Sequence, residues 1–415
     1  MSIGKNIEER RSHSMLLHLM AFFSLFPYLN FLGLGTDTQP NALIIAAIVL
    51  FTVRKKRITS AIVVLWTQVL FASLLFFMNS LELFIFVKTF MNYLSPPMLG
   101  TAFYVAFSQL HYRLSFKFFL AAILFYAFVG IVQLYWYPDF MLFIVNESRG
   151  LLFGGRGVLS LCPEPSFYGS MSIFFIIFSL LAYTKKQNLF VIPFQLVQIL
   201  LLSKSSTAIA ILGFALIIFS VIQIIKLRIR YIIVASLALA IAIPVVTQQL
   251  EKLEESRMGK VAQHFIDDPL KITQVDGSVG IRFAGTVAPF INMRYNNFMP
   301  MGLGRFEIFQ ADLYGKGRCR SFLNRAIIHH ETRISGGINM ALFQLGFLGL
   351  FLPIGIFLAF KKSMGTDTGL FAYILFTTIL FTQIQMMHAM IGLIIGFAIF
   401  HGNQLRVKKY SKTLE

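Results

Sequence analysis

The stretch GGRGVLSLCPEPSFYGSMSIFFIIFSLLAY, residues 154–183, decides the fold. Residues 166–183 form an apolar run without a charged side chain, nearly long enough for a helix to cross a bilayer. The preceding part carries Arg156 and Glu164 among glycines and prolines, which do not suit the middle of such a helix. The stretch therefore predicts an apolar helix that begins directly after a polar loop.

Apolar runs of this kind recur along the 415-residue chain, which is 57% hydrophobic and 13% charged. A soluble protein of this length needs more polar residues to cover its surface. In lipid, only helices and closed barrels give every backbone N–H and C=O group a hydrogen-bond partner, and these runs are too long for barrel strands. We expect an all-α, polytopic transmembrane bundle of about twelve spans. The predicted spans are 15–34, 41–53, 59–78, 81–110, 118–137, 166–183, 189–203, 207–225, 231–247, 338–360, 370–387 and 389–402.

Lysine and arginine orient this bundle. The basic clusters at 54–57 and 406–412 fall on the same predicted side as the N-terminus, whereas the short loops opposite carry none. By the positive-inside rule, both termini are expected to be cytoplasmic. The basic N-terminus has no small-residue cleavage site after it, which favours an uncleaved first helix. The net charge of +18 then reflects topology, and no nucleic-acid partner is expected.

Three parts follow from this topology. Residues 1–247 would form a bundle of nine spans with an arginine-bearing outer loop at 138–165. Residues 248–337 would form one large outer loop, and residues 338–415 would supply three spans and a cytoplasmic tail. The outer face therefore has two long polar segments that could face each other.

Basic residues gather near the ends of the outer-facing spans. A single such residue is more often solvated or bound to a lipid headgroup. A cluster of them is what binding a diphosphate requires, because guanidinium groups pair bidentately with phosphate oxygens. The candidates are Arg149, Arg156, Lys204, Arg282, Arg294 and Arg305.

The acid–base candidates on the same face are Glu164, His329, His330 and Glu331, apart from His388. A histidine pair alone is more often an incidental loop feature, and Glu164 could simply belong to a helix start. Together with the basic cluster, these groups favour group transfer from a lipid diphosphate. No metal-ligand spacing is present, and neither a metal nor a cofactor is expected.

The two cysteines, Cys162 and Cys319, both fall in the predicted outer loops. A disulfide between them is possible in an oxidising compartment. Free thiols are favoured, because Cys162 lies beside the apolar run VLSL.

The order of motifs from about residue 140 to 355 resembles a known family. An arginine-bearing outer loop ends in SLCPEPSFYG and precedes the hairpin LLLSKSSTAIAIL; a large loop with GIRF, MGLG and a histidine segment precedes the span INMALFQLGFLGL. This order is similar to that of Wzy-type polysaccharide polymerases and the related O-antigen ligases, membrane glycosyltransferases of the GT-C class.

The resemblance implies a metal-independent enzyme at the periplasmic face of a bacterial inner membrane. A polymerase would transfer the growing glycan from undecaprenyl diphosphate onto the next undecaprenyl-diphosphate-linked repeat unit, with membrane lipids and a chain-length regulator as further partners. The family's hairpin basic residue falls on Lys204, where many members have arginine. Its loop arginine falls on Arg282, and its histidine on His329 or His330.

These positions suggest roles for the candidate residues. Arg282, Lys204 and either Arg149 or Arg156 would neutralise the diphosphate, and His330 would accept the hydroxyl proton, with Glu164 and His329 as the next candidates.

Three other functions stay open. An O-antigen ligase would transfer glycan to lipid A core, but HHETR lacks the asparagine that follows histidine in several ligases. A transporter or flippase would line a central path with charges, whereas Lys88 is the only basic residue well inside a predicted span. A structural or sensor protein is the remaining alternative.

Overall fold

The computed structural model describes residues 2–33, 37–53, 58–78, 83–145, 157–226, 277–295, 297–306 and 334–414. Within these residues every regular element is helical, and the β contacts amount to one isolated bridge between Leu29 and Val145. The α-helices are α1 (Ser2–Leu25), α2 (Asn41–Thr52), α3 (Ser60–Met78), α4 (Leu83–Ser108), α5 (Phe116–Tyr135), α6 (Pro165–Ala182), α7 (Lys185–Val197), α8 (Ser206–Ile225), α12 (Gly277–Tyr295), α15 (Gly337–Leu345), α16 (Phe351–Phe360), α17 (Asp367–Thr382) and α18 (Ala389–Leu414).

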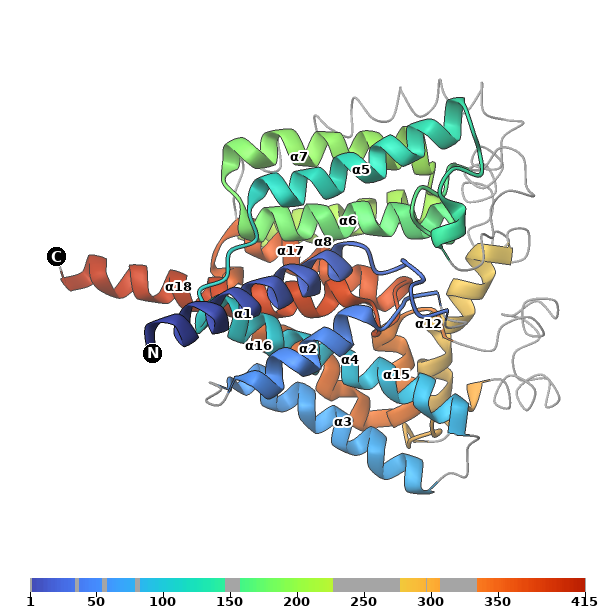
Figure 1. Cartoon of the computed structure of the whole chain (residues 1–415). Coiled ribbons are helices and arrows are strands. Elements are labelled where there is room, and N and C mark those ends of the chain that lie inside the picture. Colours follow the sequence, from blue (N-terminus) through green and yellow to red (C-terminus); the bar gives the residue numbers. More distant parts are fainter. Residues whose placement is uncertain are drawn as a thin grey trace.

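Most of these helices lie side by side along one common direction, with both chain ends at the same end of the bundle (Figure 1). At the opposite end α12 runs across the other helices (Figure 1). The segments that follow α1, precede α6 and join α17 to α18 also lie there, and we call this the loop end. All candidate residues within the described ranges belong to segments at or near this end.

The centre of the bundle is the pair α4 and α18, which approach closely because α18 carries glycines one turn apart. A Cβ at Gly392 would lie 2.2 Å from Cβ of Leu99, and one at Gly396 would lie 2.6 Å from Cβ of Phe103. Any larger side chain would push the helices apart. Small residues spaced in this way are how helices pack where no hydrophobic effect drives them together.

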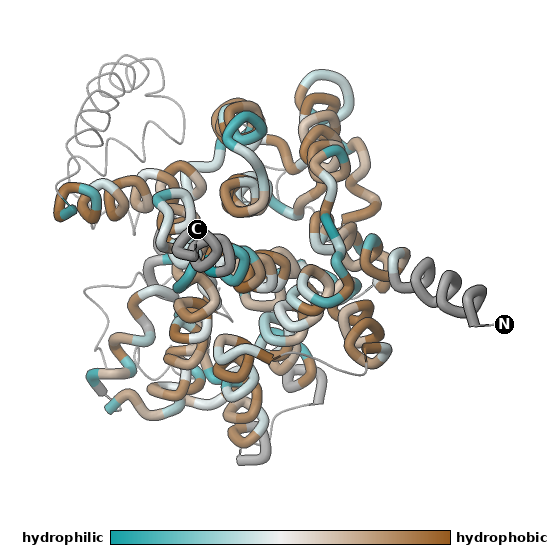
Figure 2. Tube along the Cα trace, turned by 90° about the vertical axis from the view of Figure 1, so that its left-hand side faces the viewer, coloured by the Kyte–Doolittle hydropathy of each residue, from teal (hydrophilic) through white to brown (hydrophobic). Residues whose placement is uncertain are grey.

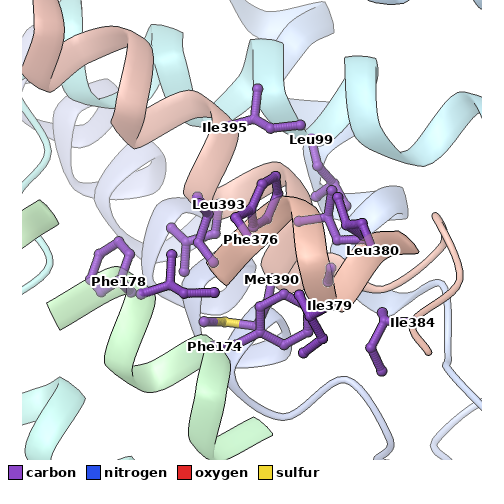
Figure 3. Close-up of a cluster of buried hydrophobic side chains, with 14 of the residues drawn as sticks. Leu99, Phe174, Phe178, Phe376, Ile379, Leu380, Ile384, Met390, Leu393 and Ile395 are labelled. Carbon is purple, nitrogen blue, oxygen red and sulfur yellow. The ribbon is translucent and has the colours of Figure 1, made fainter. Parts of the chain in front are cut away.

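Aromatic and aliphatic side chains of α6 and α17 extend this core toward the rest of the bundle (Figure 3). The rings of Phe174 on α6 and Phe376 on α17 lie 6.4 Å apart, centroid to centroid. Residues of α4, α17 and α18 complete the cluster, among them Leu99, Ile379, Leu380, Met390, Leu393 and Ile395.

Hydrophobic residues predominate along most of the helices, as Figure 2 shows, and many of them lie on the outside of the bundle. Phe214 and Ile217 on α8 and Leu70 on α3 are among many large hydrophobic side chains that lie exposed. Five helical segments among the described residues are long and apolar enough to cross a membrane. These are Phe116–Tyr135, Pro165–Ala182, Lys185–Ser203, Ser206–Ile225 and Gly337–Phe360, and shorter apolar helices accompany them. The all-α fold, with helices long and apolar enough to cross a membrane, agrees with the sequence-based expectation of an all-α membrane protein.

Several predicted boundaries differ from the structure. The span predicted at 15–34 ends at Leu25, because Pro27 and the turn around it cannot continue a helix. The predicted span 81–110 is the single helix α4, which includes Pro96 and Pro97. The run 338–360 is interrupted at Gly346, whose φ of 57° is left-handed and whose Cβ would lie 2.3 Å from the carbonyl oxygen of Phe298. The predicted span 231–247 and most of the loop 248–337 lie outside the described residues.

Candidate functional site at the loop end

The polar loop before α6 is held inside the bundle by Gln133 of α5. The Gln133 side chain accepts from the Ser160 amide at 2.6 Å and donates to the carbonyl oxygens of Ser160 at 3.0 Å and Phe140 at 2.9 Å. The Ser160 hydroxyl donates to the carbonyl of Tyr126 at 2.7 Å. Ser160 itself has a left-handed φ of 53°. Gln133 and Ser160 are both buried, so these bonds give partners to polar groups of an irregular backbone inside the bundle.

The same loop packs against the hairpin that carries Lys204. The Val158 amide donates to the Leu202 carbonyl at 2.8 Å. A Cβ at Gly157 would lie 2.0 Å from the Ser203 carbonyl oxygen, so only glycine permits this approach. The sequence predicted a loop and a hairpin separately, and the structure joins them into one unit.

Lys204 lies at the tip of that hairpin, after the π-helical turn η2 (Gln198–Ser203) and before α8. Its φ of 44° is left-handed, and its side chain is exposed. The hydroxyl of Tyr168 donates to the Gln198 side-chain oxygen at 2.8 Å and ties η2 to α6. Single π-turns inside helical segments often mark functional positions. The geometry presents one ammonium group to the solvent side of the hairpin.

Glu164 is the N-cap residue of α6, and Pro165 occupies the first helical position, where proline is tolerated. Its side chain makes no capping bond, but Oε2 accepts from the Ser166 hydroxyl at 3.1 Å. The carboxylate is half-buried and lies near the positive end of the helix dipole. The loop 157–164 ends at Glu164 and packs against the hairpin of Lys204, so it brings these two segments together.

Arg282 lies in the second turn of α12 and is half-buried, and the carbonyl of Arg282 accepts from the Thr286 hydroxyl at 2.8 Å. Helix α12 packs against the chain before α15, where a Cβ at Gly285 would lie 3.3 Å from the Ser335 amide nitrogen. It also contacts α17 through Phe290 and Phe381, whose ring centroids are 6.4 Å apart. Arg282 therefore lies on a helix inside the segment that the sequence predicted as the large outer loop.

Arg294 is exposed in the last turn of α12, and Arg305 is exposed after the turn at 300–304. That turn is fixed to α15, because the Gly302 amide donates to the Gln344 carbonyl at 3.0 Å. Glu164 and Lys204 therefore sit on the α5, α6 and α8 side, whereas Arg282, Arg294 and Arg305 sit on the α12 and α15 side. Helix α17 packs against α6, α8 and α12 and so links the two groups.

Four of the predicted site residues, Arg149, Arg156, His329 and His330, lie outside the described residues, as do Glu331 and Cys319. Cys162 is a free, fully buried thiol, and burial raises its pKa above the ordinary range for cysteine. In the part of the chain that the structure describes, no group of three or more histidine, cysteine, aspartate or glutamate side chains could hold a metal ion.

The sequence interpretation missed the structural role of Gln133 and the surroundings of His388. A single amide in the apolar run ILFYAFVGIVQLYW was the available signal for Gln133, because such groups in a membrane need a partner. His388 stood out as a titratable residue, but nothing in its sequence neighbourhood predicts its burial. Neither a family model nor a curated protein significantly matches the chain.

Proposed function

We propose that this protein is a membrane glycosyltransferase that polymerises undecaprenyl-diphosphate-linked oligosaccharide repeat units. The observation that carries the proposal is the joining of the loop 157–164 to the Lys204 hairpin, which puts a cation and the Glu164 carboxylate on one rigid unit. The arginines of α12 and the turn after it lie at the same end of the bundle. The order of motifs that resembles the Wzy-type polymerases falls on these segments.

The proposal includes a topology. About twelve spans would cross the bacterial inner membrane, with both termini in the cytoplasm and the loop end in the periplasm. The position of both chain ends at the end opposite the loop end agrees with this arrangement (Figure 1). The growing glycan and the next lipid-linked unit would then meet at the periplasmic membrane surface.

Glycosyl transfer from a lipid diphosphate needs cations to neutralise the leaving group and a base to accept a proton. An acceptor hydroxyl attacks the anomeric carbon of the donor sugar, and the undecaprenyl diphosphate leaves with its negative charge. Lys204 and Arg282 would neutralise that charge, with Arg149 or Arg156 beside them. A base must take the hydroxyl proton, and His330 fills this role in the proposal, ahead of Glu164 and His329.

The surface glycan of a deletion strain tests this function. A polymerase deletion should leave single repeat units attached to the lipid core. Full-length polymer accumulating on undecaprenyl diphosphate would indicate an O-antigen ligase instead. An unaltered glycan would exclude both enzymes and favour a transporter or a non-enzymatic role.

Complementation of that strain tests the site. Arg282→Ala should abolish the polymer ladder while the protein remains in the membrane at wild-type level. Arg113→Ala is the matched control, because Arg113 lies near the opposite end of the bundle, over the ring of Phe400 at 4.8 Å. Ladders of wild-type length from Arg282→Ala would exclude its role in binding the diphosphate.

A further inference from the structure

The turn between α17 and α18, residues 383–388, is surrounded by buried polar atoms that find no hydrogen-bond partner among the described residues. Gln383 and His388 lie within the turn and are 5% and 1% exposed. Gln68 and Asn339 each form one side-chain hydrogen bond near the turn. The Gln68 amide donates to the sulfur of Met386, and the Asn339 amide donates to the carbonyl oxygen of Phe381. The unpartnered atoms are Gln383 Nε2 and Oε1, His388 Nδ1 and Nε2, Gln68 Oε1, Asn339 Oδ1 and the hydroxyl oxygen of Tyr28.

The backbone of this turn is firmly held, so the side chains cannot simply rearrange with it. The Met387 amide donates to Asn92 Oδ1 at 3.2 Å, and the Met387 carbonyl accepts from the Ser95 hydroxyl at 3.2 Å. The Gly337 amide donates to the Ile384 carbonyl at 2.8 Å. Helices α4 and α15 thus fix both halves of the turn.

His388 lies between two aromatic rings. Its imidazole stacks on Phe174 of α6 with the centroids 4.7 Å apart, and it meets the Tyr28 ring edge to face at 5.5 Å. Tyr28 follows α1, is 0% exposed and packs in turn against Phe167, one helical turn after Glu164. Tyr28, which follows α1, and His388, which precedes α18, are therefore enclosed together next to the start of α6.

An enclosed pair of this kind is costly unless something binds it. A buried donor or acceptor without a partner costs about 1–3 kcal/mol, and a phenylalanine at position 388 would have completed the aromatic cluster at no such cost. Burial also lowers the pKa of His388 to about 3, so the imidazole is neutral and offers one donor and one acceptor. A neutral donor–acceptor pair suits water, which buried polar groups commonly bind, rather than an ion.

We propose that the α17–α18 turn is a buried hydration site, in which ordered water binds the His388 imidazole and the Tyr28 hydroxyl. The site lies at the loop end of the bundle. The Gln383 side chain and the free oxygens of Gln68 and Asn339 offer further water partners around the same turn. The proposal does not depend on the enzymatic function.

Hydroxyl-radical labelling by X-ray pulses tests the proposal, because radicals made from bound internal water oxidise the side chains beside it. The full-length protein in lipid nanodiscs would be irradiated for milliseconds and the oxidised residues identified by mass spectrometry. Tyr93 is the matched control: it is also 0% exposed, but its hydroxyl donates to Gln344 Oε1 at 2.7 Å. Tyr28 and His388 should be labelled several-fold faster than Tyr93.

The comparison within the wild-type protein does not depend on any variant folding. Labelling of Tyr28 and His388 as slow as that of Tyr93 would overturn the proposal, and so would equally fast labelling of all three. In His388→Phe, labelling of Tyr28 should fall toward the rate of Tyr93, because the water loses its main partner. Unchanged labelling of Tyr28 in that variant would show that His388 does not hold the water.

Discussion

The loop 157–164 and the turn 383–388 both carry polar groups into an apolar bundle, but they satisfy these groups differently. In the loop, both polar atoms of the Gln133 side chain and the hydroxyl of Ser160 form hydrogen bonds to protein groups. In the turn, the side chains of Gln383 and His388 have no partner among the described residues. The loop is thus a self-contained support for Glu164 and Lys204, whereas the turn requires a bound molecule.

The loop should be the less tolerant of the two segments, and Gly157→Ala should have the largest effect. The added methyl group would lie 2.0 Å from the Ser203 carbonyl oxygen, so the loop must leave the hairpin. We expect a loss of about 3 kcal/mol or more in stability, measured as a lower unfolding temperature in detergent. Gly213→Ala on α8 is the control: its methyl group meets nothing within 4 Å, and helix propensity should raise stability by about 1 kcal/mol. Equal unfolding temperatures for the two variants would contradict the close approach of Gly157 to the Ser203 carbonyl oxygen.

Replacing one buried glutamine in each segment contrasts the two directly. Gln133→Leu leaves the amide of Ser160 and two carbonyl oxygens without partners and should cost about 3 kcal/mol. Gln383→Leu deprives no protein group of a partner and should change stability by less than about 1 kcal/mol. Thermal unfolding of the two variants measures the difference. A larger loss of stability for Gln383→Leu than for Gln133→Leu would contradict this difference between the loop and the turn.

His388 should make the protein sensitive to acid. Its folded pKa of about 3 lies below the ordinary value of 6.5, so below pH 6.5 the unfolded chain binds a proton that the folded protein does not. The stability is therefore complete above pH 6.5 and falls with pH, by about 1–2 kcal/mol at pH 5. His388→Phe should remove this part of the slope in unfolding temperature against pH. Tyr28 stays neutral throughout, because burial raises its pKa. An identical slope in the variant would therefore show that His388 is not the source of the sensitivity.

Lys204 should show only a small change in stability but a clear change in function. A left-handed φ of 44° costs a non-glycine residue about 1 kcal/mol, so Lys204→Gly should stabilise the hairpin by that amount. The same variant removes the cation and should abolish polymer formation in the complemented deletion strain, whereas Lys204→Arg should retain it. Full activity of Lys204→Gly would exclude a role for the charge.

The sequence predicted the all-α class and the helices of its long apolar runs within the described residues, because such runs determine where long apolar helices lie. It was wrong about the end of the first helix, where Pro27 stops α1 at Leu25, and it missed the break at Gly346. The break depends on the approach of Phe298 from a distant segment, which no local pattern reveals.

The site was predictable only in part. Glu164 at a helix start and Lys204 in a hairpin followed from the glycine, proline and serine residues around them. Their connection through Gly157 and the support by Gln133 are tertiary contacts and have no sequence periodicity. The burial of His388 depends on Tyr28 and Phe174, which are distant in the chain.

The most direct test of the proposed function is polymerisation by the purified protein. The protein would be reconstituted in vesicles with single lipid-linked repeat units extracted from the deletion strain, without added metal, and the products separated by size. The wild-type protein should produce a ladder of longer glycans that remain on the lipid diphosphate, while Arg282→Ala produces none. Repeat units that stay single with folded wild-type protein would contradict the proposal.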